Sequence, residues 1–479
     1  MRRQDHETGF TIVVALCLFL SGALSGCRSV VNEADPVATL AVVNHPSDPQ
    51  DDAGARLFAE LAADPRETRA LWSHAGEKAV SKRDIDELVA TIDGAHLNVI
   101  LLLVYHQGTA FFEPSHARFP EDDDRLPNQS PFEEEGYNDG LSYLLAIRDE
   151  RRADDDPFND FEVHAWFTVS EGGDWTGDKK PRGDNTQPYM LHALHPEFKI
   201  KYGEYYLRED ERYVNHRYSV VHQPRFRAYM ADLIAGLVED YDVDGVHLDY
   251  IRAMSICYND EPLDYPGTDY DFPGCQADYE TWTQATFGRA YTLWQDTDGR
   301  GSIRDGRSGR IAAWQERAMG LLVKRIHDEV KAVRPGVIIS AAVGMTDPEM
   351  RNESIQGQAA WEWLDQGWID AAFVMAYSSD TQAVVDKNRS FINACQTLVC
   401  RVRVFPGLAT YTIENAEDEW SDLIVEQVNA VMFGQWEGHS LDPPTKGVAL
   451  FRDGHLNLTA IEALARGPFQ EPALPFWGR

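Results

Sequence analysis

Short apolar runs of strand length alternate along most of this chain with longer stretches whose apolar residues recur at helical spacing. Phe226, Met230, Leu233, Leu237 and Tyr241, for example, follow the spacing of one helix face. Such alternation of strands and helices is typical of an α/β fold with a parallel sheet. The apolar runs begin near Leu71, Val99, Glu162, Val243, Val337, Asp370, Val402 and Gly447.

Strand and helix patterns that repeat over roughly 400 residues predict a (β/α)8 barrel, or TIM barrel, with long loop insertions. The alternative is an open doubly wound sheet, which is expected to carry a glycine-rich nucleotide turn after its first strand. The residues at that place, Ala75-Gly76-Glu77, do not form such a turn. We therefore expect the barrel over residues 67–465 and a C-terminal tail over 466–479.

The N-terminus has the organisation of a bacterial export signal. A positively charged start precedes an apolar segment over residues 10–24, and Leu24-Ser25-Gly26-Cys27 follows at once. This ending resembles a lipobox, whose cysteine is lipidated and becomes the mature N-terminus. The alternative, an uncleaved anchor, is disfavoured because the apolar segment is shorter than the ~20 residues of a spanning helix.

The expected precursor therefore has a lipoprotein signal peptide over residues 1–26 and a lipidated tether over 27–66. A cysteine that carries several acyl chains holds a protein firmly at a membrane. We expect an exported protein that is anchored through Cys27, with the outer membrane or the cell surface favoured.

Four cysteines lie beyond the signal and the tether, and they form two close pairs. In an exported protein this arrangement predicts disulfides between Cys257 and Cys275 and between Cys395 and Cys400, although four cysteines allow three pairings. A metal site is the alternative. It is disfavoured because neither pair has CxxC spacing and no histidine lies at ligand spacing beside them.

Composition and charge exclude two classes of protein. The 479 residues include 44 Lys and Arg against 78 Asp and Glu, so the formal net charge is −34, which argues against a nucleic-acid partner. Hydrophobic residues make up 43% of the chain, which is too many for a disordered acidic protein. No cofactor is indicated. Asp296-Thr297-Asp298-Gly299 resembles the start of a calcium loop, but no glutamate closes the loop, and a plain turn is favoured.

The fourth apolar run carries the clearest chemical signal. Side chains alternate along a strand, so Val246 and Leu248 share one face of this run, while His247 and Asp249 share the other. The apolar face must lie under the helices, which directs Asp249 inward at the C-terminal end of its strand. Barrel enzymes place their reacting groups at this rim. The alternative is a structural ion pair between Asp249 and Arg252.

The decapeptide from Tyr241 to Tyr250 resembles the signature of the family-10-like glycosyl hydrolases, bacterial barrel proteins of cell-wall and polysaccharide metabolism that are often exported or lipidated. Residues 98–112, 163–167 and 370–377 resemble the family's second, third and sixth strands. The turn after the second strand departs from the family pattern. This chain has Tyr105-His106-Gln107-Gly108-Thr109-Ala110 where an Arg-Pro-x-Gly-Asp-Ala-like turn is usual.

The resemblance implies hydrolysis of a glycosidic bond, which usually needs two carboxyl groups. We expect Asp249 to be the first, as nucleophile or general base. Asp380, on the loop after strand six, ranks first as its partner and Glu171, after strand three, ranks next; Asp453 and Glu113 are further candidates. We expect no metal ligand. The predicted substrate contacts are Tyr105, His106, His164, Trp166, His247, Arg252 and Tyr377.

The sequence thus predicts a lipid-anchored glycoside hydrolase that cleaves a cell-envelope or extracellular polysaccharide, with peptidoglycan glycan strands as the leading candidate. The alternative is a non-catalytic surface lipoprotein whose barrel binds carbohydrate. The altered turn after the second strand favours the alternative, whereas the inward Asp249 favours the enzyme.

Overall fold

The computed structural model describes residues 66–121, 124–154, 156–173, 187–200, 218–297, 308–344, 356–410, 417–436, 440–441 and 444–477. The predicted signal peptide, Cys27 and almost all of the predicted tether lie outside these residues, as do Asp298 and Gly299 of the candidate calcium loop.

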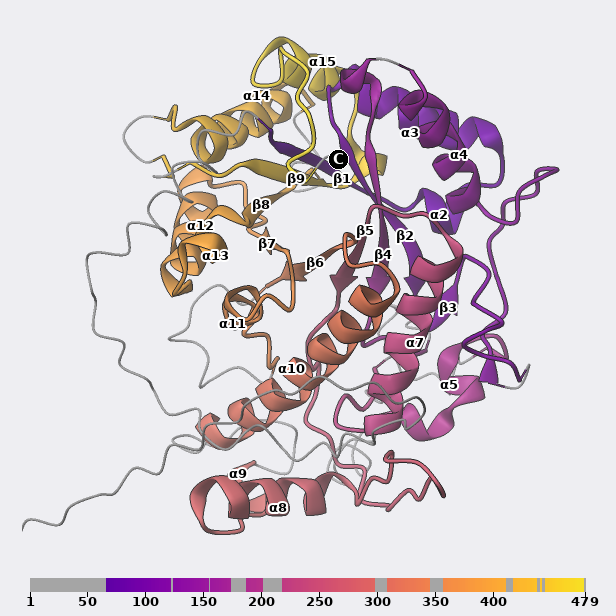
Figure 1. Cartoon of the computed structure of the whole chain (residues 1–479). Helices are drawn as coiled ribbons and strands as arrows, with labels where there is room; N and C mark the ends of the chain where they lie inside the picture. Colours follow the sequence, from indigo (N-terminus) through magenta and orange to yellow (C-terminus); the bar gives the residue numbers. More distant parts are fainter. Residues whose placement is uncertain are drawn as a thin grey trace, which may run out of the picture. The chain divides into compact units, whose positions relative to one another are not determined.

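Within the described part of the chain, eight parallel strands form a closed barrel (Figure 1). Neighbouring strands follow the order β1-β9-β8-β7-β6-β5-β4-β2, and pairing of β1 with β2 closes the ring. The predicted (β/α)8 barrel is therefore confirmed. The barrel strands are β1 (Thr68–Ser73), β2 (Val99–His106), β4 (Glu162–Thr168), β5 (Gly245–Asp249), β6 (Ile338–Val343), β7 (Ala371–Met375), β8 (Val404–Ala409) and β9 (Gly447–Phe451).

Helices surround the barrel, and the long helices α7 and α10 lie side by side on its outside (Figure 1). A short strand that was not predicted, β3 (Thr109–Ala110), pairs antiparallel with the end of β2. The helices are α2 (Ala75–Lys78), α3 (Lys82–Gly94), α4 (Gly140–Arg152), α5 (Leu191–Leu194), α7 (Pro224–Asp240), α8 (Cys275–Phe287), α9 (Leu293–Asp296), α10 (Ser308–Val333), α11 (Ala360–Asp365), α12 (Thr381–Ala394), α13 (Leu398–Val402), α14 (Glu417–Val428) and α15 (Leu458–Arg466).

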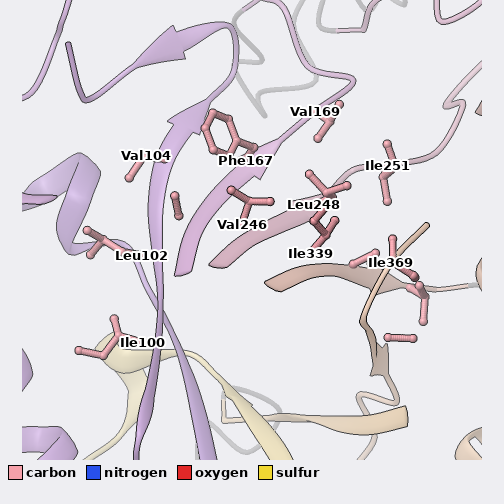
Figure 2. Close-up of a cluster of buried hydrophobic side chains, with 14 of the residues drawn as sticks. Ile100, Leu102, Val104, Phe167, Val169, Val246, Leu248, Ile251, Ile339 and Ile369 are labelled. Atoms are coloured by element: carbon pink, nitrogen blue, oxygen red, sulfur yellow. The ribbon is translucent and has the colours of Figure 1, made fainter. Parts of the chain in front are cut away.

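The two faces of the strands build two separate cores. Val163, Ala165 and Phe167 of β4 pack outward against the helices, whereas Trp166 packs inside the barrel. The outward side chains of β2, β4, β5 and β6 form one continuous apolar layer (Figure 2). Val246 and Leu248 of β5 also belong to the outer core. The alternation that was predicted for β5 is therefore confirmed, and it is this alternation that directs Asp249 inward.

Both predicted disulfides are present. Cys257 is bonded to Cys275 with a Cα–Cα distance of 5.9 Å, and Cys395 is bonded to Cys400 with a Cα–Cα distance of 5.6 Å. The first bond lies in the long insertion between β5 and β6. Its two cysteines belong to a small apolar core that also contains Tyr279.

The C-terminal residues were expected to form a tail, but their described part packs against the barrel. Phe476 and Trp477 join the apolar core inside the barrel, and both rings contact Phe405 at the beginning of β8, with ring centroids 5.8 and 5.2 Å apart. The backbone N–H of Glu67 donates to the carbonyl of Leu474 at 3.0 Å. The segment therefore closes the end of the barrel at which the strands begin. None of the described helices is long and apolar enough to cross a membrane.

Candidate active site

Asp249 ends β5 at the mouth of the barrel, where the strands have their C-terminal ends. Its neighbour in register on β4 is Thr168. Asp249 is only 6% exposed, and this burial raises the pKa of its carboxyl group. Arg252, the backbone N–H of Tyr250, Trp166 and His106 act in the opposite direction, but burial has the larger effect. A buried carboxyl group whose pKa is raised is suited to donate a proton.

Arg252 is a weak partner for this carboxylate. Its Nη1 lies 3.9 Å from Oδ1 of Asp249, which is too long for a hydrogen bond. The guanidinium group instead stacks on the ring of Tyr250, 4.5 Å from the ring centroid. The backbone N–H of Tyr250 donates to Oδ1 of Asp249 at 2.6 Å. Tyr250 has a φ of 47°, so the chain turns sharply immediately after the acid. The turn holds Asp249 more directly than the arginine does.

His74, just after β1, and Glu77, in the following turn α2, belong to the mouth and were not predicted. Nδ1 of His74 lies 3.0 Å from one carboxylate oxygen of Glu77, and Nδ1 of His106, at the end of β2, lies 3.2 Å from the other. Burial alone raises the pKa of Glu77, but the hydrogen bonds from His106 and His74 outweigh it and hold the pKa well below its usual value. Glu77 therefore carries a fixed negative charge.

The same histidine approaches Glu171, which follows β4. Nε2 of His106 lies 3.8 Å from Oε2 of Glu171. The backbone N–H of Gln107 donates to this oxygen at 3.3 Å, and the hydroxyl of Tyr105 donates to the Glu171 carbonyl at 2.8 Å. The charge of His106 also acts to lower the pKa of Asp249, although burial outweighs it. One imidazole therefore interacts with Glu77, Glu171 and Asp249.

Aromatic rings surround these groups. Trp166 is only 3% exposed, and its ring lies edge-on to that of His74, with centroids 5.2 Å apart. The partly exposed ring of Tyr377, just beyond β7, stacks on Phe451 of β9 at 5.3 Å. Sugar rings pack their C–H faces against such aromatic surfaces. The mouth therefore combines buried acids with a partly exposed aromatic ring.

Residues 67–422 match the family described as Glycosyl hydrolase-like 10. The chain belongs to this family. The match covers all the barrel strands from β1 to β8. None of the curated proteins matches the chain.

A solved glycoside hydrolase shares the fold of this glycosyl hydrolase-like protein. The β-galactosidase of Bacillus circulans sp. alkalophilus aligns with a TM-score of 0.52 at 10% identity, over 86% of this chain and 57% of that chain. The glycoside hydrolase domain of PgaB (BpsB) from Bordetella bronchiseptica aligns over 86% of this chain and 99% of that chain, with 13% identity and a TM-score of 0.44.

The other predicted acids of this family member lie in different surroundings. Asp380 is exposed and forms the N-cap of α12, where its side chain accepts from the backbone N–H of Gln382 at 2.9 Å. Asp453 accepts a hydrogen bond of 2.6 Å from Ser73 at the end of β1. Glu113 lines a pocket beside Tyr241. Tyr241 precedes β5, so this pocket lies toward the opposite end of that strand from Asp249. Glu171 is the predicted partner that lies beside His106, whose charge also acts on Asp249.

Three predicted substrate contacts of this glycosyl hydrolase-like protein are fully buried and bonded to protein groups, so the prediction of direct contacts is corrected for them. His247 is fully buried, where it accepts from the Trp72 indole at 3.0 Å and bonds Ser340 at 2.9 Å. His164 is fully buried 3.2 Å from Glu162. Tyr105 packs in the outer core and supports Glu171. Alternation correctly placed His247 inside the barrel, but it did not show how deep this side chain lies.

The residue that begins the candidate calcium loop has other partners in this family member. Asp296 is fully buried, accepts from the Tyr279 hydroxyl at 2.6 Å and forms an ion pair with Arg310. Its carboxylate is therefore engaged by protein groups. Sequence reasoning missed His74 and Glu77, although a search for polar residues just after the first apolar run, Leu71-Trp72-Ser73, would have found them.

Proposed function

We propose that this protein is a glycoside hydrolase in which Asp249 is the general acid and Glu171 is the second carboxylate. The observation that carries the proposal is the position of Asp249, an inward and buried acid with a raised pKa at the mouth of the barrel. The approach of His106 to Glu171 supports the pairing. The family match and the fold agree with this chemistry.

The two acids have different neighbours. Burial favours the neutral form of Asp249, which can protonate the oxygen of the leaving sugar. Glu171 is fully buried, and its carboxylate accepts from the backbone N–H of Gln107 and lies beside His106, two neighbours that stabilise a negative charge. A charged carboxylate can attack the sugar or activate a water molecule. Pairs of acids that differ in this way divide the roles of acid and base.

The proposed substrate is a cell-envelope or extracellular polysaccharide, with peptidoglycan glycan strands as the leading candidate. The resemblance to bacterial proteins of cell-wall and polysaccharide metabolism supports this class. The test is to incubate the purified protein with peptidoglycan and with neutral polysaccharides and to measure new reducing ends. We expect at least one of these glycans to be cleaved. Binding of a glycan without any cleavage would instead support the non-catalytic carbohydrate-binding barrel.

We also propose that the protein is exported and tethered to a membrane through a lipid on Cys27, with the outer membrane or the cell surface favoured. The apolar segment and the Leu24-Ser25-Gly26-Cys27 ending support this location. Cys27→Ala is expected to leave an uncleaved precursor without lipid, which mass spectrometry of the membrane fraction can identify. A variant that matures and partitions like the wild type would show that the tether is absent.

A further inference from the structure

Glu77 is an acid of the mouth to which the proposed reaction gives no role. It belongs to the short turn α2, which follows β1 directly. The turn lies tight against β2, because a Cβ atom on Gly76 would come within 2.1 Å of the Leu103 carbonyl oxygen. The absence of a side chain at position 76 therefore brings Glu77 to the end of β2, where His106 is located.

One carboxylate of Glu77 engages two imidazoles through equivalent atoms. Nδ1 of His74 lies 3.0 Å from Oε2, and Nδ1 of His106 lies 3.2 Å from Oε1. Since Glu77 remains ionised, it can only accept, so both Nδ1 atoms carry hydrogen. The second nitrogen of His106, Nε2, is then the atom that approaches Glu171, at 3.8 Å.

We propose that Glu77 is a positioning residue that acts through His106: its carboxylate holds the Nδ1 hydrogen of His106 and directs Nε2 of the same ring to Glu171. In this arrangement the imidazole of His106 bridges two carboxylates, with Nδ1 toward Glu77 and Nε2 toward Glu171. The importance of this arrangement for turnover rests on the proposed glycosidase function, whereas the arrangement itself does not.

The charges around the two histidines differ. His74 is partly buried. Burial lowers the pKa of its imidazole, Glu77 raises it, and Arg452 and Lys78 lower it further. The ring is therefore neutral near pH 7. His106 contacts Glu77 and Glu171, and its ring lies 6.1 Å from that of His74. Of the two imidazoles that bind Glu77, His106 is therefore the one that also approaches Glu171. His106 lies at the turn after β2, where the chain departs from the expected family pattern.

The substitution Glu77→Gln tests the proposal because it keeps the shape and removes the charge. A neutral amide can donate as well as accept, so it no longer fixes the hydrogen on Nδ1 of His106. We expect kcat to fall about tenfold with KM nearly unchanged, because the ring no longer directs Nε2 to Glu171. Glu87→Gln, on the exposed side of α3, is the matched control and should leave both constants unchanged.

A double substitution separates positioning from a merely structural role. In a His106→Asn background, Glu77→Gln should change kcat by no more than about twofold, because the residue through which it acts is already absent. A tenfold loss in both backgrounds would show that Glu77 does not act through His106, and would overturn the proposal.

A third measurement does not depend on turnover. Nitrogen NMR of the wild-type protein, at a pH at which His106 is neutral, should find the hydrogen of this ring on Nδ1. Glu77→Gln should reduce the population of this tautomer. A hydrogen on Nε2 in the wild type would overturn the proposal, whether or not any glycan is cleaved. The expected tautomer in a protein that cleaves no glycan would contradict the glycosidase function alone.

Discussion

Asp249→Asn is expected to lower the turnover of a natural glycan by about 10²–10⁴-fold, which is the range that a general acid supplies. Asparagine has nearly the same shape as aspartate, but it cannot give a proton to the leaving oxygen. Glycan binding should survive, because the lost interaction is made in the transition state. Turnover and binding by the purified variant check this result. Turnover within about tenfold of the wild type would remove Asp249 from the mechanism.

The leaving group distinguishes an acid from a nucleophile at this position. An aryl glycoside with a good leaving group needs little protonation, so a variant without the general acid should retain much more activity on it than on a glycan. If Asp249 is the nucleophile instead, as the sequence alone suggested, both substrates should lose turnover to a similar extent. Parallel kinetics on the two substrates therefore decide between these two roles.

The stability of the same variant has an expected sign. The folded protein raises the pKa of Asp249, so the charged form costs free energy once the pH rises above the unfolded value of about 3.9. Asp249→Asn removes this cost, so the free energy of unfolding at pH 7 should be equal to or higher than that of the wild type. The difference should shrink as the pH falls toward 4. A loss of stability at pH 7 would instead indicate a structural ion pair with Arg252.

The sequence predicted the barrel because short apolar runs of strand length alternate with residues at helical spacing, and these two patterns were sufficient. A barrel strand has one face toward the helices and one toward the interior, so the alternation of Val246, His247, Leu248 and Asp249 determined which side chains point inward. The rule that reacting groups follow the strand ends then placed Asp249 correctly. The same rule was not applied to the first strand, which explains why His74 and Glu77 were missed.

The position of an acid after a strand could not decide which acid is the second carboxylate. Asp380 and Glu171 both follow predicted strands, but an aspartate just before a helix is also a preferred N-cap, and the structure places Asp380 there. Whether an acid after a strand leans into the mouth depends on contacts between distant segments. Glu171 is held by residues at the end of β2, more than 60 positions earlier. Sequence patterns do not report such contacts.

The C-terminal segment illustrates the same limit. Residues 466–479 were expected to form a C-terminal tail. Phe476 and Trp477 nevertheless pack against Phe405, about 70 positions earlier in the chain, and complete the core inside the barrel. A barrel needs apolar side chains at the end where its strands begin, and this chain supplies them from outside its own repeats.

Glu171→Gln should be the second substitution with a large effect, and Asp380→Asn is its matched comparison. Glutamine still accepts from the Gln107 N–H, but it cannot carry the charge that an oxocarbenium-like transition state or an attacking water needs, so turnover should fall by about 10³-fold or more. Asparagine caps a helix as well as aspartate does, so Asp380→Asn should keep α12 intact and leave turnover within about twofold. Turnover and melting temperature of both variants check the assignment. An active Glu171→Gln beside an inactive, well-folded Asp380→Asn would transfer the role of second carboxylate to Asp380, as the sequence first ranked it.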